Sequence, residues 1–229
     1  MEGTADLFAY HGWGFDRHCW DSWQECIYPW INLKRFDRGY FGPSERVELN
    51  PEAYGANVVM AHSYGLHLCP SGAIEQADLL VIFGGFLRFH PEAAQYKRRS
   101  RLVLRQMIQQ LRDEPRAVLR KFWTNAYHPD PAPDRRPEKI DKTVLFNDLK
   151  ALNESALDPD TLKKAGKICI LHGSEDGIVL PANGRELFNR LGEQSTYFEV
   201  KDAGHALPFT HTEECWKFLK PELRALMNR

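Results

Sequence analysis

The chain has 229 residues, enough for one domain with a substantial hydrophobic core. Its net charge of −1 gives no overall attraction to nucleic acid or to a membrane surface. Five cysteines without paired spacing suggest reduced thiols, and Met1 to Asp6 has neither the basic start nor the apolar run of a signal peptide. We therefore expect a cytoplasmic protein without a membrane-spanning segment.

The first predicted strand, Leu7 to Tyr10, leads directly into the turn His11-Gly12-Trp13-Gly14. Glycines allow the backbone to come close to a ligand. A turn of this kind after an early strand can aim a backbone N–H at a reacting carbonyl oxygen, so the N–H of Trp13 is a candidate oxyanion donor. A glycine turn beside a packed tryptophan is the alternative interpretation. Because the strand begins so early, there is little room for the two strands that often precede it in such sheets. We therefore expect an N-terminally trimmed sheet, one without those strands.

The next elements alternate between helix and strand. Trp20 to Trp30 is predicted to be a helix with aromatic anchors, and Leu33 to Phe36 a strand that ends in the glycine turn Asp37 to Pro43. Ala77 to Phe86 is another buried strand. This alternation predicts an α/β protein with a doubly wound, mostly parallel sheet that binds ligands at the carboxyl ends of its strands.

The stretch from Asn57 to Leu68 changes at Ser63 from a short apolar run to a helical pattern. This change is typical of a nucleophile elbow, where a serine occupies a tight turn and the residues two before and two after it must be small. Those residues are Ala61 and Gly65, so A-H-S-Y-G replaces the usual G-x-S-x-G. Ser63 is therefore a candidate nucleophile, and the N–H of Tyr64 is a second candidate oxyanion donor. A buried strand before an ordinary serine turn fits these five residues equally well.

Residues 88–158 have helical periodicity, with Leu104, Ile108 and Leu111 on one stripe. Four prolines between 129 and 137 divide the segment into two helical parts. We interpret 88–158 as a helical cap over the active site, inserted into a single domain whose sheet core comprises 1–87 and 159–229.

The cap is unusually basic. The segment from Lys97 to Lys121 contains nine basic and two acidic residues. Its charge is therefore +7, and the rest of the chain carries −8. The spacing of Arg98, Arg101, Arg105 and Arg112 aligns them along one helical face. A solvated helix face and a surface that binds an anionic partner are both consistent with this pattern.

A serine nucleophile needs a base that is oriented by a third group, and the C-terminal third supplies both. Lys167 to Gly173 is a predicted strand followed by a loop that contains Asp176, and Thr196 to Val200 is the next strand, followed by His205. Serine, acid and histidine thus occur in the order of an α/β-hydrolase triad. The three placements together favour a catalytic Ser63.

The chain also resembles a known family at five motifs: His11-Gly12-Trp13-Gly14, Ala61-His62-Ser63-Tyr64-Gly65, residues 173–179, Gly204-His205-Ala206 and Phe209-Thr210-His211. Together they are similar to the pimeloyl-[acyl-carrier protein] methyl ester esterases of biotin synthesis, which have the α/β-hydrolase fold. The resemblance covers most of the chain and is weakest in the cap. Ala61 departs from the family's glycine and leaves a different substrate open.

The resemblance implies an ester hydrolase that needs no cofactor. It implies Ser63 as nucleophile, Asp176 as acid and His205 as base, with the backbone N–H groups of Trp13 and Tyr64 as oxyanion donors. It also implies that an acidic acyl-carrier protein docks on the basic cap helix. The residues expected to contact substrate or carrier are Arg98, Arg101, Leu102, Leu104, Arg105 and Arg112.

Several alternatives stay open at this stage. Glu175, beside Asp176, and Asp148, in the cap, could each supply the acid. Histidines 62 and 67 flank the elbow without a carboxylate at ligand spacing, which disfavours a metal site. Gly84-Gly85 has no context that indicates phosphate binding. A small-molecule carboxylesterase, a C–C bond hydrolase and a non-catalytic binding protein of the same fold are the alternative functions.

Overall fold

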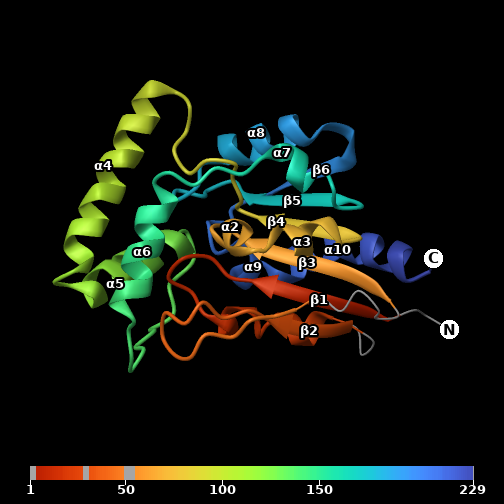
Figure 1. Ribbon diagram of the computed structural model, residues 1–229, viewed down its shortest axis with the longest axis horizontal. Helices are drawn as coiled ribbons and strands as arrows, with labels where there is room; N and C mark the ends of the chain where they lie inside the picture. Colours follow the sequence, from red (N-terminus) through yellow and green to blue (C-terminus); the bar gives the residue numbers. More distant parts are fainter. Residues whose placement is uncertain (1–3, 28–30, 49–54, 229) are drawn as a thin grey trace.

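The computed structural model describes residues 4–27, 31–48 and 55–228. Its centre is one sheet of six parallel strands in the order β2-β1-β3-β4-β5-β6 (Figure 1). The strands are β1 (Ala5–Tyr10), β2 (Ile31–Arg35), β3 (Ala56–His62), β4 (Leu79–Phe83), β5 (Ile168–Gly173) and β6 (Ser195–Val200). The predicted α/β class and its parallel sheet are confirmed.

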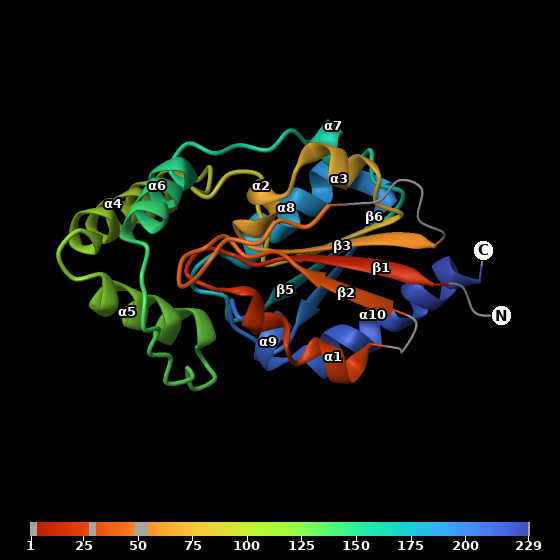
Figure 2. The same cartoon turned by 60° about the horizontal axis from the view of Figure 1, so that its bottom comes forward.

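Both faces of the sheet are covered, which explains why the inner strand β4 is apolar and buried throughout. In β4, Leu79, Val81 and Phe83 pack into one hydrophobic cluster, whereas Leu80 and Ile82 pack into another on the opposite face. Figure 2 shows a layer of helices on each face of the sheet. One layer contains α2 (Gly65–Leu68), α3 (Ser71–Glu75), α7 (Pro159–Leu162) and α8 (Pro181–Leu191), and the other α1 (Trp23–Cys26), α9 (Leu207–Thr210) and α10 (Thr212–Met227). No helix in the described ranges is both long enough and apolar enough to cross a bilayer.

The helix predicted from Trp20 to Trp30 is wrong. The chain forms a 3₁₀ turn at Arg17–Trp20 and then only the four residues of α1, after which Ile27 is extended. The side chains of Trp20 and Trp23 are fully buried against the sheet, and the indole N–H of Trp23 donates to the carbonyl of Pro208 at 2.8 Å. Tertiary packing of the two indoles therefore outweighs the helical pattern. Residues 28–30 lie outside the described residues.

The cap segment contains three helices where two parts were predicted: α4 (Ala94–Leu111), α5 (Pro115–Tyr127) and α6 (Lys142–Leu152). Pro115 starts a new helix, since proline suits the first helical position, so the first predicted part is itself divided. The three helices lie together beyond one end of the sheet, away from both termini (Figure 1). Their apolar sides share a third hydrophobic cluster with residues of the sheet loops.

The chain enters and leaves the cap at adjacent points. Arg88 and Ala156 form an antiparallel bridge, and the N–H of Leu157 donates to the carbonyl of Leu87 at 3.0 Å.

His67 of α2 joins these two connections to the core. Its Nε2 donates to the carbonyl of Phe86 at 3.0 Å, so Nδ1 is free to accept the hydroxyl of Ser155. Burial lowers the pKa of His67 to about 4. The neutral imidazole therefore links both connections of the cap to α2.

This burial predicts a loss of stability in acid. The folded state resists protonation of His67, whereas the unfolded chain takes up the proton below about pH 6.5. The free energy of unfolding should therefore fall by up to about 3 kcal/mol between pH 6.5 and pH 4 on account of this group, whose folded pKa is about 4. Urea unfolding of wild type and His67→Gln over this range measures the effect.

The wild type should lose more stability than His67→Gln as the pH falls. His18→Gln is the control, because the His18 side chain is 64% exposed. If His67→Gln and wild type had the same pH dependence, His67 would not be the source of the loss.

Candidate active site

Ser63 lies at the sharp turn between β3 and α2. Its φ is +54°, a left-handed conformation that is rare for a residue with a side chain and costs about 1–3 kcal/mol. Its N–H donates to the carbonyl of Phe83 on the neighbouring strand at 2.9 Å. Ala61 is fully buried, and a Cβ on Gly65 would lie 2.4 Å from the carbonyl oxygen of Tyr10. The small residues on both sides of Ser63 are thus required by close packing, as the elbow motif predicts.

His205 and Asp176 complete a chain of hydrogen bonds that starts at Ser63. The Nε2 of His205 lies 2.9 Å from the Oγ of Ser63, and its Nδ1 lies 2.7 Å from the Oδ2 of Asp176. The side chains of His205 and Asp176 are buried, and Ser63 is 8% exposed. Since the carboxylate accepts the Nδ1 proton, the Nε2 lone pair faces the serine hydroxyl. This is the geometry that a general base needs in order to take a proton from Ser63.

Asp176 is held as a carboxylate. Burial alone would raise its pKa, but the attraction of His205 and the hydrogen bonds from His172 and His205 hold the pKa well below its ordinary value. The second carboxylate oxygen accepts the backbone N–H groups of Ile178 and Val179, each at 2.9 Å.

Two further histidines support the pair, and the sequence did not reveal either role. His172, at the end of β5, places Nε2 3.3 Å from Asp176 and 2.8 Å from the carbonyl of Val179. His62, directly before Ser63, donates from Nε2 to the carbonyl of His205 at 2.9 Å, and the two rings are 4.8 Å apart. Burial lowers the pKa of His62 well below its usual value. In the sequence, the feature that could have indicated these roles is that each histidine lies at the end of a predicted buried strand.

The turn that follows β1 lies directly beside the elbow. A Cβ on Gly12 would be 3.0 Å from the Cβ of Ser63. Within the described part of the chain, the backbone N–H groups of Trp13 and Tyr64 donate no hydrogen bond. Trp13 follows Gly12 and Tyr64 follows Ser63, so both predicted oxyanion donors belong to the two turns that meet here.

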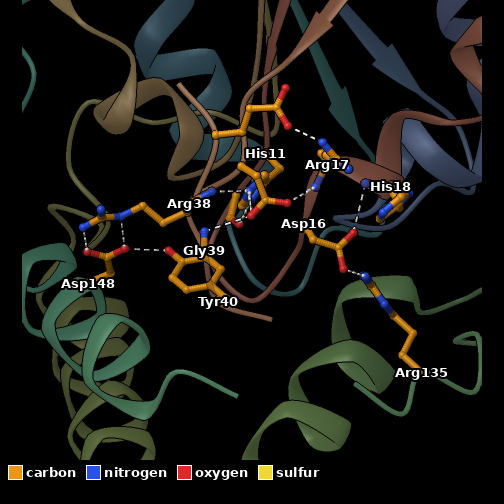
Figure 3. A network of polar contacts seen from close by, with 12 residues as sticks. His11, Asp16, Arg17, His18, Arg38, Gly39, Tyr40, Arg135 and Asp148 are labelled. Carbon is orange, nitrogen blue, oxygen red and sulfur yellow. Dashed lines mark hydrogen bonds and ion pairs between the residues drawn. The ribbon is translucent and has the colours of Figure 1, made fainter. Parts of the chain in front are cut away.

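Asp148, the alternative acid in the cap, is engaged elsewhere. Arg38 donates to both of its carboxylate oxygens at 2.8 Å, and the hydroxyl of Tyr40 donates at 2.7 Å (Figure 3). Glu175, the other alternative, is exposed. Of the three carboxylates considered, the one that hydrogen-bonds His205 is Asp176.

The predicted cap residues lie in different environments. Arg101, Arg105 and Arg112 line an open groove of about 490 Å³ between α4 and α6, together with Ile108, Phe146, Lys150, Asn153 and Glu154. Arg98 is exposed on α4 but does not line the groove, and Leu102 is 53% exposed. Leu104 is buried in the apolar cluster of the cap. The four arginines are thus all on the surface, but only three share one recess.

No group of three or more His, Cys, Asp or Glu side chains in the described ranges is arranged to hold a metal ion.

Comparison with solved structures identifies the fold. The chain is similar to a bromoperoxidase from Bacillus anthracis (TM-score 0.77, 15% identity, 97% of this chain and 92% of that one). It is also similar to a thermophilic esterase from Thermogutta terrifontis (0.73, 18%, 99% and 91%) and to an enol-lactonase from Burkholderia xenovorans LB400 (0.74, 16%, 96% and 91%). Neither a protein-family model nor a curated protein sequence matches. The chain has the α/β-hydrolase fold.

Gly84, for which the sequence indicated no role, packs against Asp176 and His205. It follows β4 with φ +53°, and a Cβ there would lie 3.2 Å from Nδ1 of His205 and 3.3 Å from Oδ2 of Asp176.

Gly84→Ala should displace His205 and Asp176 and lower turnover of a short p-nitrophenyl ester about tenfold or more. Gly42→Ala is the control, because a Cβ at Gly42 would meet nothing within 4 Å. Equal turnover of the two variants would contradict the expectation.

Proposed function

We propose that the protein is a serine hydrolase that cleaves a carboxylic ester, with Ser63 as nucleophile, His205 as base and Asp176 as the acid that orients the base. The observation that carries this proposal is the continuous hydrogen-bond chain from Ser63 through His205 to Asp176. The esterase and the enol-lactonase among the similar structures support the same reaction class.

In the proposed mechanism, His205 takes the hydroxyl proton as the Oγ of Ser63 attacks the ester carbonyl carbon. The N–H groups of Trp13 and Tyr64 bind the oxyanion, an effect worth about 3 kcal/mol for each donor. His205 then gives the proton to the departing alcohol. Water activated by His205 hydrolyses the acyl-enzyme and restores Ser63.

The finer proposal is that the ester is the methyl ester of a pimeloyl group attached to acyl-carrier protein, as in biotin synthesis. It rests on the motif resemblance and on the cations of the cap groove. Arg101, Arg105, Arg112 and Lys150 line this recess with one acidic residue, Glu154. Such a concentration of positive charge attracts an acidic carrier protein and raises its association rate.

Substitution of the proposed triad tests the reaction class. Ser63→Ala, His205→Ala and Asp176→Asn should each lower turnover of an ester by about three to six orders of magnitude, because the three groups act as a unit. Ser63→Ala should also abolish labelling by a fluorophosphonate probe, which a non-catalytic binding protein would not show even as wild type. Asp148→Asn is the control for Asp176→Asn. Near-normal turnover by Asp176→Asn together with inactive Asp148→Asn would reverse the assignment of the acid.

Charge reversal in the groove tests the carrier. Arg101→Glu with Arg105→Glu should lower kcat/KM for methyl pimeloyl carrier protein at least tenfold at low salt, because like charges then meet across the interface. Turnover of a short p-nitrophenyl ester should stay near normal. Added salt should weaken wild-type activity on the carrier-linked ester and spare the small one.

The matched control is Arg120→Glu with Lys121→Glu, an identical charge change at exposed positions of α5. Equal losses with the two double variants would indicate a general effect of charge and would contradict docking in the groove.

A further inference from the structure

Helix α5 of the cap directly contacts the turn after β1, residues 11–16, which contains the proposed oxyanion donor Trp13 and is named the oxyanion turn. The indole N–H of Trp123 donates to the carbonyl of Gly14 at 2.8 Å, across 109 residues of sequence. The ring of Phe122 packs on the same turn. A Cβ on Gly14 would lie 3.1 Å from this ring, and the ring centroids of Phe122 and Trp13 are 5.0 Å apart. Gly14 follows Trp13, whose N–H is the proposed donor.

The same helix contacts the loop of the proposed base. The N–H of Ala206, the residue after His205, donates to the carbonyl of Ala126 at 2.8 Å. Gly204, the residue before His205, packs on the carbonyl of His128 so closely that a Cβ would lie 1.8 Å from that oxygen. Both neighbours of His205 thus contact the C-terminal end of α5.

Other contacts fix the cap to these loops. The indole N–H of Trp13 donates to the carbonyl of Leu145 in α6 at 2.9 Å. Figure 3 shows Arg135, from the loop between α5 and α6, paired with Asp16 at the end of the oxyanion turn. Trp13, Gly14 and Asp16 therefore each hydrogen-bond to a residue of the cap segment.

We infer that α5 is a positioning element for catalysis, in which Trp123 fixes the distance between the oxyanion turn and His205. The inference rests on the proposed hydrolysis and adds a function to the cap besides substrate contact. One helix binds the turn that carries an oxyanion donor and the loop that carries the base, so it fixes their separation. An oxyanion donor acts only at 2.7–3.1 Å from the developing charge, and a displacement of about 1 Å can cost a hundredfold in rate.

A positioning role differs from substrate binding in what it changes. Loss of an acyl contact would alter KM and chain-length preference. Loss of the Trp123–Gly14 bond should lower kcat even for an ester too small to reach the cap, with KM almost unchanged, because the donor binds the oxyanion more strongly than the ground-state carbonyl.

The test compares two tryptophan-to-phenylalanine substitutions with p-nitrophenyl acetate as substrate. Trp123→Phe removes the indole N–H and keeps an aromatic ring. Trp23→Phe removes an equally short indole–carbonyl bond, to Pro208, that is also buried. We expect kcat of Trp123→Phe to fall about ten- to a hundredfold with KM within about twofold. Trp23→Phe should show a similar loss of thermal stability and near-normal kcat.

The inference is overturned if Trp123→Phe and Trp23→Phe lower kcat equally, or if Trp123→Phe changes KM alone. If Trp123→Phe does not fold, Phe122→Leu loosens the same turn and is judged by the same criteria. Absence of wild-type turnover with every ester tried would instead refute the proposed hydrolysis, and the positioning role with it.

Discussion

The strained turn at Ser63 is the constraint on which the rest of the structure depends. A residue with a side chain at φ +54° is stable only where its surroundings fix it, and here the fixing comes from strand pairing to Phe83 and from close packing at Gly65. Because all described strands are parallel, the loops after β1, β3, β4, β5 and β6 meet at one edge. Gly12 and His205 therefore lie against the serine, and Gly84 and Asp176 lie against His205, although they are distant in sequence.

Burial at this edge demands that polar groups find partners. Asp176, a buried carboxylate, accepts two backbone N–H groups and the imidazole of His205, and Nε2 of His172 lies 3.3 Å away, which offsets the cost of removing a charge from water. His62, His172 and His67 each donate to a backbone carbonyl. These three histidines thus donate hydrogen bonds to the backbone of the loops after β6, β5 and β4.

The sequence predicted the sheet and the order of Ser63, Asp176 and His205, because both follow from local patterns and from the geometry of parallel strands. It did not predict the break of the Trp20–Trp30 helix or the division of the cap into three helices. It also missed His62, His172, Gly84 and Trp123. The roles of His62, Gly84 and Trp123 depend on contacts between residues far apart in the chain, such as the 109 residues between Trp123 and Gly14. Local periodicity contains no information about such a contact. The division of the cap at Pro115 and the contact of His172 with Asp176 are local instead.

Helix α6 connects the two proposed functions of the cap. The carbonyl of Leu145 accepts the indole of Trp13 on the inner side, whereas the ring of the next residue, Phe146, lines the outer groove 4.9 Å from the guanidinium of Arg112. A partner bound in the groove would therefore contact the helix that holds the oxyanion turn. If such a partner raised the affinity for a transition-state mimic at Ser63, the mimic would raise the affinity of the partner by the same factor, since coupling between two binding sites is reciprocal.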